Sequence, residues 1–437
     1  MLRGAELRAA RPAAPCRALR ASRRRYAATH RRAAASAAPP EPSPPSLGRR
    51  AATAGGVLLG GAAAFRLGAA VTLAGAPRFP PLGGRFAVAG LDLRLPSAGV
   101  RARLLYPCDP SASAPALAYM GSPVLDEGKA QAASLAGLVR FPAWLTTHLA
   151  DGASGVLAAG SAVPVAPGRF PSLAYSHGFG GNAQMGTRVL AEIASHGVVV
   201  LAVEHTDGSA SRTVRADGSV LRFGERPPGA GRNAGLALRA VELRGAAAAL
   251  AGGADAEALP AQVLAACDPA AAFLGGHSYG APTALLALRS GRDPPFAGVL
   301  LHDAALQMSQ GLLSSPESAA SLTPRLFLMS DEYAASDAAR EPVLAATRAA
   351  PPGSGAYLLR GAAHGNYVDA AYWAPSFVMR GLARLGIPAA GAGDADVVLR
   401  VIGESGAAFL RGADAGRPGF AGEQPLLQPL ALTPRTA

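Results

Sequence analysis

Short apolar runs rich in β-branched residues alternate with longer alanine-rich segments along the chain after residue 80. A short apolar run between turn residues is typical of a buried strand, and the longer segments have the hydrophobic period of a helix. Their alternation indicates βαβ units, in which a crossover helix makes successive strands parallel. We therefore predict an α/β fold with a mostly parallel central sheet and helices on both faces.

The pattern also places the individual elements. Strands are expected within 101–107, 170–178, 191–205, 271–276, 296–303, 324–332 and 356–365, helices within 234–250, 282–288 and 396–412, and a hairpin over 214–223. These elements define a catalytic domain over 80–415. The Pro-rich remainder, 416–437, is expected to be a loose tail.

One strand-to-helix junction carries a candidate nucleophile. Gly276-His277-Ser278-Tyr279-Gly280 reads G-x-S-x-G, between the expected strand at 271–276 and the helix that follows. The pattern alone is weak evidence in a chain with 53 glycines. The strand-turn-helix context supports it, because such a turn exposes a serine hydroxyl for attack on an acyl carbon. Bulk at Gly276 or Gly280 would clash with the neighbouring strand and helix.

Polar residues follow the later strands as well. Asp303 ends one strand, Asp331 and Glu332 end the next, and His364 lies just past the last. Ser, acid and His thus occur in the chain order of an α/β-hydrolase, at the carboxyl edge of a parallel sheet. His364 is expected to be the general base. The residues alone leave the acid open between Asp303 and the Asp331-Glu332 pair.

An earlier loop is a candidate oxyanion hole. The segment "YSHGFGGN", 175–182, runs from a strand into an H-G-x-G turn. Such a loop can offer a backbone N–H to a developing oxyanion. We expect the donors to be the amides of Phe179 and of Tyr279, the residue after the nucleophile. The alternative is a plain glycine turn.

Together these segments resemble the platelet-activating factor acetylhydrolase family, in its plasma or type II lipase-like branch. The resemblance extends from about residue 100 to 412, and its most distinctive part is "EHTDGSAS", 204–211. Other matching strings are "LLYP", "AYSHGFGGN", "GGHSYGAPTA", "LLHDAAL" and "AAHGNYVDA". Two segments depart from the family: Ala281-Pro282 after the serine motif, and the poorly matching stretch between Pro110 and Pro167.

The resemblance implies roles that the residues alone leave open. It places the acid at Asp303, with Ser278 as nucleophile and His364 as base, and supports Phe179 and Tyr279 as oxyanion donors. It implies calcium-independent hydrolysis of a short or oxidised sn-2 acyl group from a glycerophospholipid, the activity of a 1-alkyl-2-acetylglycerophosphocholine esterase of phospholipase A2 type. No metal or other cofactor is expected.

Two other functions remain open. One keeps the chemistry and changes the substrate: a carboxylesterase or polyester hydrolase acting on small soluble esters. The other is a catalytically silent α/β-hydrolase fold that serves as a binding protein, against which the intact set of Ser278, Asp303 and His364 argues. Liposome binding would separate a lipid enzyme from a soluble-ester enzyme.

The charge is concentrated in the first fifty residues. Residues 1–50 hold twelve arginines against two glutamates, a net +10 of the chain's +12, so the remainder carries only 12 − 10 = +2. Nucleic-acid binding by the folded part is therefore not supported. An arginine-rich, acid-poor leader is typical of organelle targeting.

A second targeting signal is expected after this leader. Arg49-Arg50 precede an apolar segment over 51–77 that ends in small residues, resembling a twin-arginine export signal. We expect plastid targeting, with the thylakoid lumen as a destination, and a secreted or cytosolic protein as alternatives. The apolar run falls short of a spanning helix.

Both tryptophans lie in apolar segments. Trp144 falls in "LVRFPAWLTTHLA" and Trp373 just after the candidate base. Such segments near a lipase mouth can contact a membrane surface and collect substrate. Equally, they can cover the pocket or fill core. The oligomeric state is left open.

Overall fold

The computed structural model describes most of the chain beyond residue 76. The described residues are 77–120, 128–138, 146–159, 163–225, 232–289, 296–309, 311–313, 323–384, 390–417, 420 and 424–430. All of them belong to one compact unit, Ala64–Ala437. The expected leader over 1–50 and all but the last residue of the apolar segment lie outside the described residues.

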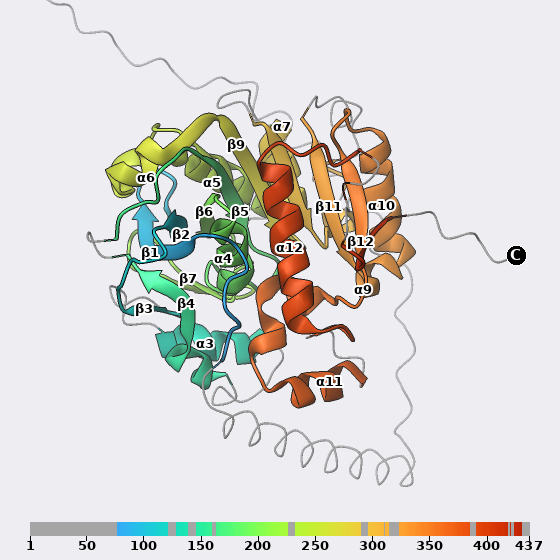
Figure 1. Cartoon of the computed structure of the whole chain (residues 1–437), viewed down its shortest axis with the longest axis horizontal. Helices are drawn as coiled ribbons and strands as arrows, with labels where there is room; N and C mark the ends of the chain where they lie inside the picture. The colour runs from blue at the N-terminus through green and yellow to red at the C-terminus, as the bar shows by residue number, and fades with distance from the viewer. Residues whose placement is uncertain are drawn as a thin grey trace, which may run out of the picture. The chain divides into compact units, whose positions relative to one another are not determined.

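A single large sheet forms the centre of this unit (Figure 1). Its order across the described strands is β13-β12-β11-β10-β9-β5-β6-β2-β1-β4-β3. The strand bounds are β1 Ala87–Leu95, β2 Val100–Cys108, β3 Ala116–Ala118, β4 Ala153–Ala158, β5 Phe170–Ser176, β6 Val199–Glu204, β9 Cys267–His277, β10 Gly298–His302, β11 Arg325–Ser330, β12 Gly355–Leu359 and β13 Leu427–Pro429. A separate hairpin pairs β7 Arg212–Val214 with β8 Val220–Arg222.

Parallel pairing dominates the middle of the sheet. β6, β5, β9, β10, β11 and β12 are joined by parallel ladders, whereas β2 pairs antiparallel with both β6 and β1, and β13 antiparallel with β12. The carboxyl ends of six strands therefore meet at one edge. This arrangement confirms the predicted α/β-hydrolase fold with a mostly parallel sheet.

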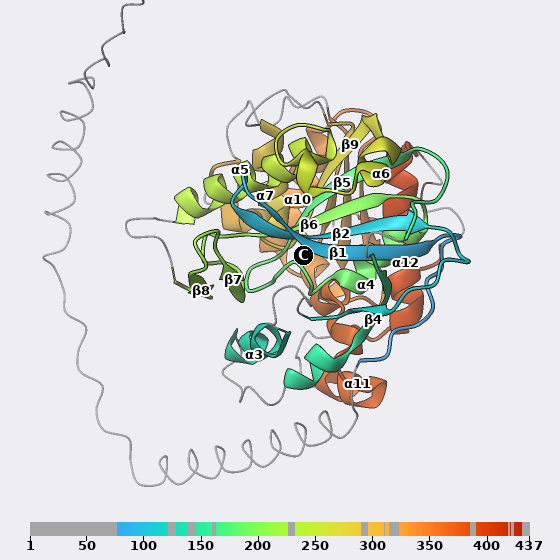
Figure 2. The ribbon, with the colours of Figure 1, turned by 90° about the vertical axis from the view of Figure 1, so that its left-hand side faces the viewer.

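Helices cover both faces of the sheet. Figure 2 shows α5, α7 and α10 on one side and α4 and α12 on the other. The helix bounds are α3 Gly128–Leu138, α4 Thr187–Ser195, α5 Arg232–Leu250, α6 Ala261–Ala266, α7 Gly280–Arg289, α9 Asp331–Ala334, α10 Asp337–Arg348, α11 Ser376–Arg384 and α12 Ala395–Leu410. Each face has its own apolar core.

The burial of the central strands explains why the apolar runs in the sequence predicted them. Every residue of β6 is buried, because helices cover it from both sides, and its sequence is accordingly the apolar run VVLAVE. α12 begins at a clear cap, where the Asp394 carboxylate accepts hydrogen bonds from the amides of Asp396 at 2.9 Å and Val397 at 3.1 Å. All the strands and helices named from the sequence are present, with ends shifted by a few residues.

The structure corrects the expectation for 416–437. Residues Leu427–Pro429 form β13 and extend the sheet beyond β12. Upstream of β13, the Tyr357 hydroxyl donates to the Ala415 carbonyl at 2.7 Å and ties the chain after α12 to β12. A three-residue strand with a proline lies below the length at which a period-2 pattern can be recognised, so the tail seemed loose from composition alone.

Candidate active site

The turn around Ser278 is strained in the way a nucleophile turn requires. β9 ends at His277 and α7 begins at Gly280, and Ser278 between them has φ +54°. A non-glycine residue in this left-handed region is uncommon and costs free energy. The turn is held by the Ser278 amide, which donates to the His302 carbonyl at 2.9 Å, and by the Ser278 carbonyl, which accepts from the amides of Ala281 and Ala305.

The two motif glycines are sterically required. A Cβ at Gly276 would lie 2.3 Å from the Gly280 carbonyl oxygen at the start of α7. A Cβ at Gly280 would lie 2.0 Å from the carbonyl oxygen of Ser176, at the end of β5. Both contacts are with backbone atoms, which cannot turn aside. The strand, the turn and the helix pack this closely only because neither residue has a side chain.

Asp303 is the carboxylate that reaches His364. It follows β10 with φ +44°, has no exposed surface, and accepts a hydrogen bond from His364 Nδ1 at 2.9 Å. Its two oxygens also accept the amide and the hydroxyl of Ser330, each at 2.7 Å. The three donors compensate the cost of burying the carboxylate.

The other acid candidates do not face the His364 ring. Asp331 instead accepts the Arg360 guanidinium at 3.0 Å and the Gly361 amide at 2.6 Å. Glu332 accepts the backbone amide of His364 at 3.1 Å. Both carboxylates thus fix the loop that carries His364. Of the acid candidates that sequence logic left open, Asp303 is the one that contacts the His364 ring.

Ser278 and His364 share a neighbour, Tyr333, that the sequence did not indicate. The Tyr333 ring stacks on the His364 imidazole, with centroids 4.3 Å apart and planes at 4°. The Tyr333 hydroxyl also interacts with the Ser278 side chain, an interaction that lowers the pKa of Tyr333. The only sequence signal for Tyr333 was its place three residues after Ser330, the end of β11.

The H-G-F-G loop lies against the nucleophile. A Cβ at Gly178 would be 3.0 Å from the Ser278 Cβ, so only glycine lets the loop approach this closely. The rings of Phe179 and Tyr279 meet edge to face at 5.5 Å, and Phe179 is 45% exposed. The two predicted oxyanion donors therefore belong to neighbouring residues beside Ser278.

The distinctive segment 204–211 is hydrogen-bonded to the H-G-F-G loop. The Gly180 amide donates to the Ser209 carbonyl at 2.7 Å, and the Ser211 amide donates to the Gly181 carbonyl at 2.8 Å. These backbone bonds tie the segment after β6 to the loop after β5. The string EHTDGSAS thus positions the candidate oxyanion hole.

A buried arginine connects the H-G-F-G loop after β5 to the start of α7, which follows Ser278. Arg239 of α5 has no exposed surface, and its guanidinium donates to the carbonyl of His177 and to Ser176 Oγ. On the other side it donates to Thr283 Oγ1 at 3.0 Å and lies 5.0 Å from the centre of the Tyr279 ring. One side chain thus spans both candidate donor segments. Nothing in the sequence pattern of α5 singled it out.

Buried neutral histidines surround the site. Burial lowers the pKa of His177, His205 and His277 well below the usual value and lowers that of His302 to about 3. Burial likewise raises the pKa of Glu242, which accepts from His205 Nδ1 at 2.7 Å, to about 8.

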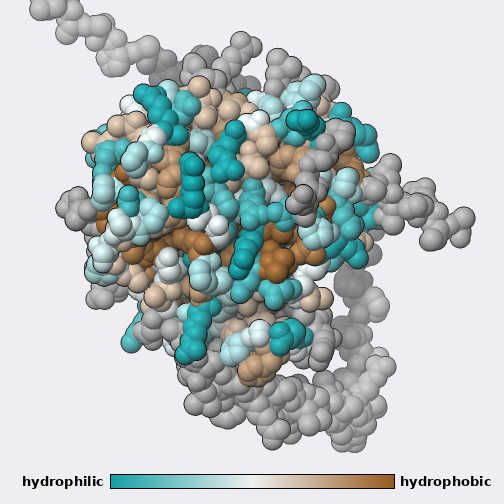
Figure 3. Space-filling model, in the orientation of Figure 1, coloured by the Kyte–Doolittle hydropathy of each residue, from teal (hydrophilic) through white to brown (hydrophobic). Residues whose placement is uncertain are grey.

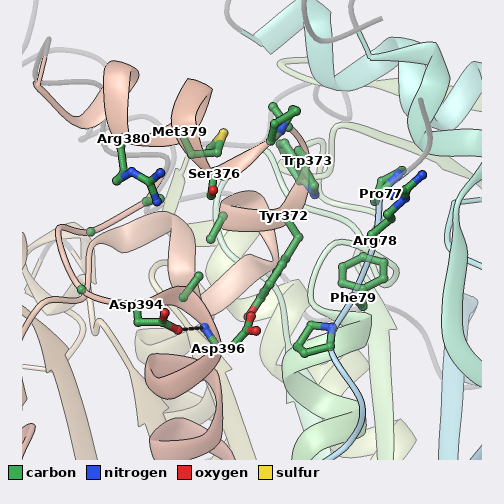
Figure 4. A pocket seen from close by; sticks show the side chains of 18 residues that line it. Pro77, Arg78, Phe79, Tyr372, Trp373, Ser376, Met379, Arg380, Asp394 and Asp396 are labelled. Atoms are coloured by element: carbon green, nitrogen blue, oxygen red, sulfur yellow. Dashed lines mark hydrogen bonds between the residues drawn. The ribbon is translucent and has the colours of Figure 1, made fainter. Parts of the chain in front are cut away.

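Of the two tryptophans that the sequence singled out, only Trp373 lies within the described residues. Trp144 lies outside the described residues. The Trp373 indole N–H donates to the Tyr119 hydroxyl at 2.8 Å, and its ring lines a cavity of about 640 Å³ (Figure 4). Tyr372, Phe79 and residues of α11 form other walls of the cavity, whereas Ser278 does not contribute to it. Trp373 is therefore half-buried beside a cavity separate from the nucleophile.

The part of the chain that the structure describes contains no cluster of three or more His, Cys, Asp or Glu side chains suited to a metal ion. None of its helices has the length and apolarity needed to cross a bilayer.

A strained serine between strand and helix, a histidine held by a buried carboxylate, and a glycine loop beside the serine all lie at one sheet edge. This is the organisation of the α/β-hydrolase class. A family model described as platelet-activating factor acetylhydrolase, isoform II, matches residues 72–221. Over this stretch the chain is similar to that family, and its fold and site are those of a serine ester hydrolase. The match includes the H-G-F-G loop and segment 204–211, and ends before Ser278.

A comparison with solved structures agrees with the fold, whereas no curated protein sequence matches the chain. Among solved structures, a ferulic acid esterase from Streptomyces cinnamoneus superposes with a TM-score of 0.57, over 79% of this chain and 94% of that chain, at 20% identity. At this identity the similarity shows the fold alone.

We expect Gly280→Ala to destabilise the fold, because the new Cβ would overlap the Ser176 carbonyl. Overpacking of this kind costs about 1–3 kcal/mol or more. Urea unfolding of the variant and of Gly137→Ala measures the effect. Gly137 lies in α3 with open space around its Cα, so alanine there should be neutral or stabilising. Equal stability of the two variants would contradict the steric explanation.

We expect the free energy of unfolding to fall as pH drops below about 6.5, where unfolded histidines take up protons that His302 cannot bind until about pH 3. His302 therefore contributes stability that is fully present above pH 6.5 and is lost toward pH 3. Urea titrations between pH 4 and 7 should show a slope about 1.4 kcal/mol per pH unit shallower in His302→Gln. Parallel curves would exclude this linkage.

We expect Arg239→Lys to lower kcat about 100-fold, because lysine cannot hold the His177 carbonyl and Thr283 together. The matched control is Arg325→Lys, because Arg325 is a buried arginine at the amino end of β11, whereas the candidate site lies at the carboxyl ends of the strands. Rates per active site, titrated with a fluorophosphonate, separate catalysis from folding. Wild-type kcat in Arg239→Lys would show that the guanidinium is dispensable for the site.

Proposed function

We propose that this protein hydrolyses the sn-2 ester of glycerophospholipids whose sn-2 acyl group is short or oxidised. The observation that carries the proposal is the position of the family match. Residues 72–221 include the H-G-F-G loop and the segment beneath it, and this loop packs against Ser278. The family resemblance and the candidate chemistry therefore coincide at one place in the fold.

The geometry supports an acyl-enzyme route. Ser278 Oγ attacks the ester carbonyl, and His364, oriented through Nδ1 by Asp303, takes the serine proton. The amides of Phe179 and Tyr279 receive the oxyanion. His364 returns the proton to the leaving lysophospholipid oxygen. Water then attacks the acyl-serine with His364 as base, and releases the free acid and Ser278.

Peripheral membrane contact is part of this proposal. Phe377 on α11 is 66% exposed, and Trp373 lies just before this helix. Figure 3 shows apolar surface at the lower edge of the molecule, where Figure 1 places α11. Exposed aromatic side chains of this kind insert into the interfacial region of a bilayer. A plastid location, proposed from the leader over 1–50, would supply a lipid surface.

A second candidate is an esterase for small soluble esters. It is favoured by the similarity to the ferulic acid esterase, which extends over 94% of that enzyme's chain. The same Ser278, His364 and Asp303 would perform the chemistry. The two candidates differ in the alcohol released and in the need for a lipid surface.

We expect serine-dependent release of free acid from phospholipids with sn-2 acetyl or oxidised short chains, and little from long chains. The assay is performed in excess calcium chelator with the full chain. Ser278→Ala should reduce the rate at least about 1,000-fold, because the nucleophile is lost. Cleavage of an aryl ester without release from any lipid would favour the soluble-ester candidate.

A further inference from the structure

One short segment contacts every member of the candidate triad. Ser330 donates two hydrogen bonds to Asp303, and Glu332 accepts the amide of His364. Tyr333, in the same turn of α9, reaches both His364 and Ser278. Ser330, Glu332 and Tyr333 thus all contact residues of the candidate triad, although none of the three belongs to it.

The Tyr333 ring restricts the movement of the base. Asp303 holds His364 by Nδ1 alone, which leaves the imidazole free to swing about its side-chain bonds. A parallel aromatic ring at 4.3 Å blocks this swing on the face that it covers. The His277 ring, 4.4 Å from that of His364 and tilted by 40°, restricts it further. The base is therefore held by packing as well as by its hydrogen bond.

The Tyr333 hydroxyl also interacts with the nucleophile. Burial raises the pKa of Tyr333 above its usual value, while the hydrogen bond with Ser278 opposes that shift. The phenol therefore remains protonated through neutral pH and can hydrogen-bond the serine hydroxyl. The ring thus packs on the candidate base, and the hydroxyl is available to the candidate nucleophile.

We propose that Tyr333 is a positioning residue for acyl transfer, which aligns Ser278 with His364. When the serine proton moves to His364, the imidazolium forms against the face of the Tyr333 ring. An aromatic face attracts a cation more than a neutral ring, so this contact strengthens in the transition state. Its loss should therefore lower kcat rather than raise KM.

This inference depends on the serine chemistry of the proposed function and not on its lipid substrate. The test compares Tyr333→Phe with Tyr333→Leu, using 4-nitrophenyl acetate and the rate of labelling by a fluorophosphonate. A lipid assay that fails while the aryl ester is cleaved would refute the phospholipid proposal and still allow Tyr333 to be tested. Tyr357→Leu is the control, because Tyr357 is a buried tyrosine in β12 away from the triad.

We expect Tyr333→Leu to lower kcat per titrated site about 100-fold with KM within about threefold, since base and nucleophile lose their alignment. Tyr333→Phe, which keeps the ring, should lose only about 2- to 10-fold, the equivalent of one neutral hydrogen bond. Tyr357→Leu should lower the melting temperature and leave kcat unchanged.

Three results would overturn the inference. They are kcat in Tyr333→Leu within about threefold of the wild type, an equal loss in the phenylalanine and leucine variants, or a loss in Tyr357→Leu as large as that in Tyr333→Leu. Because rates are expressed per fluorophosphonate-titrated site, a fraction of unfolded variant does not imitate a loss of kcat.

Discussion

The burial of the Asp303 carboxylate is the constraint on which the site depends. A carboxylate without exposed surface is tolerated only where hydrogen bonds replace its water. Here two donors come from Ser330 and the third from His364, so the strand end at β11 and the loop after β12 must both be in place. The candidate base, His364, is consequently oriented by the same bonds that compensate the burial of Asp303. Removing either donor residue would leave a buried charge undercompensated.

A group of buried polar side chains that take no part in the serine chemistry packs around the candidate site. Arg239, His205, Glu242 and Ser176 form a connected network beneath the candidate oxyanion loop. Groups of this kind are costly when partly satisfied and rigid when fully satisfied. A loop rich in glycine has little stiffness of its own. The H-G-F-G loop therefore derives its stiffness from these buried side chains and from its backbone bonds to segment 204–211.

Much of this architecture could be predicted from the sequence. The buried parallel strands appear as continuous apolar runs, and the turn at Ser278 appears as glycines at fixed offsets, because both constraints are local. The placement of Asp303 against His364 joins residues 61 positions apart, and sequence logic alone could not choose between Asp303 and Asp331. Tyr333 and Arg239 were missed for the same reason. A tyrosine in a short helix and an arginine in an alanine-rich helix have no local feature that reveals their partners.

The order of strands divides the sheet by position along the chain. Every described strand from β1 to β6 lies on one side of the β5–β9 pairing, and β9 to β13 lie on the other. The candidate oxyanion loop follows β5, whereas Ser278, Asp303 and His364 follow strands beyond that seam. The family match covers the first half only. The candidate active site is thus assembled across a junction between two halves of the chain, which Arg239 spans. A small opening at this junction would separate the candidate oxyanion donor Phe179 from the candidate nucleophile Ser278 while both halves kept their secondary structure. Turnover is therefore a more sensitive reporter of this junction than any spectroscopic measure of helix or strand content.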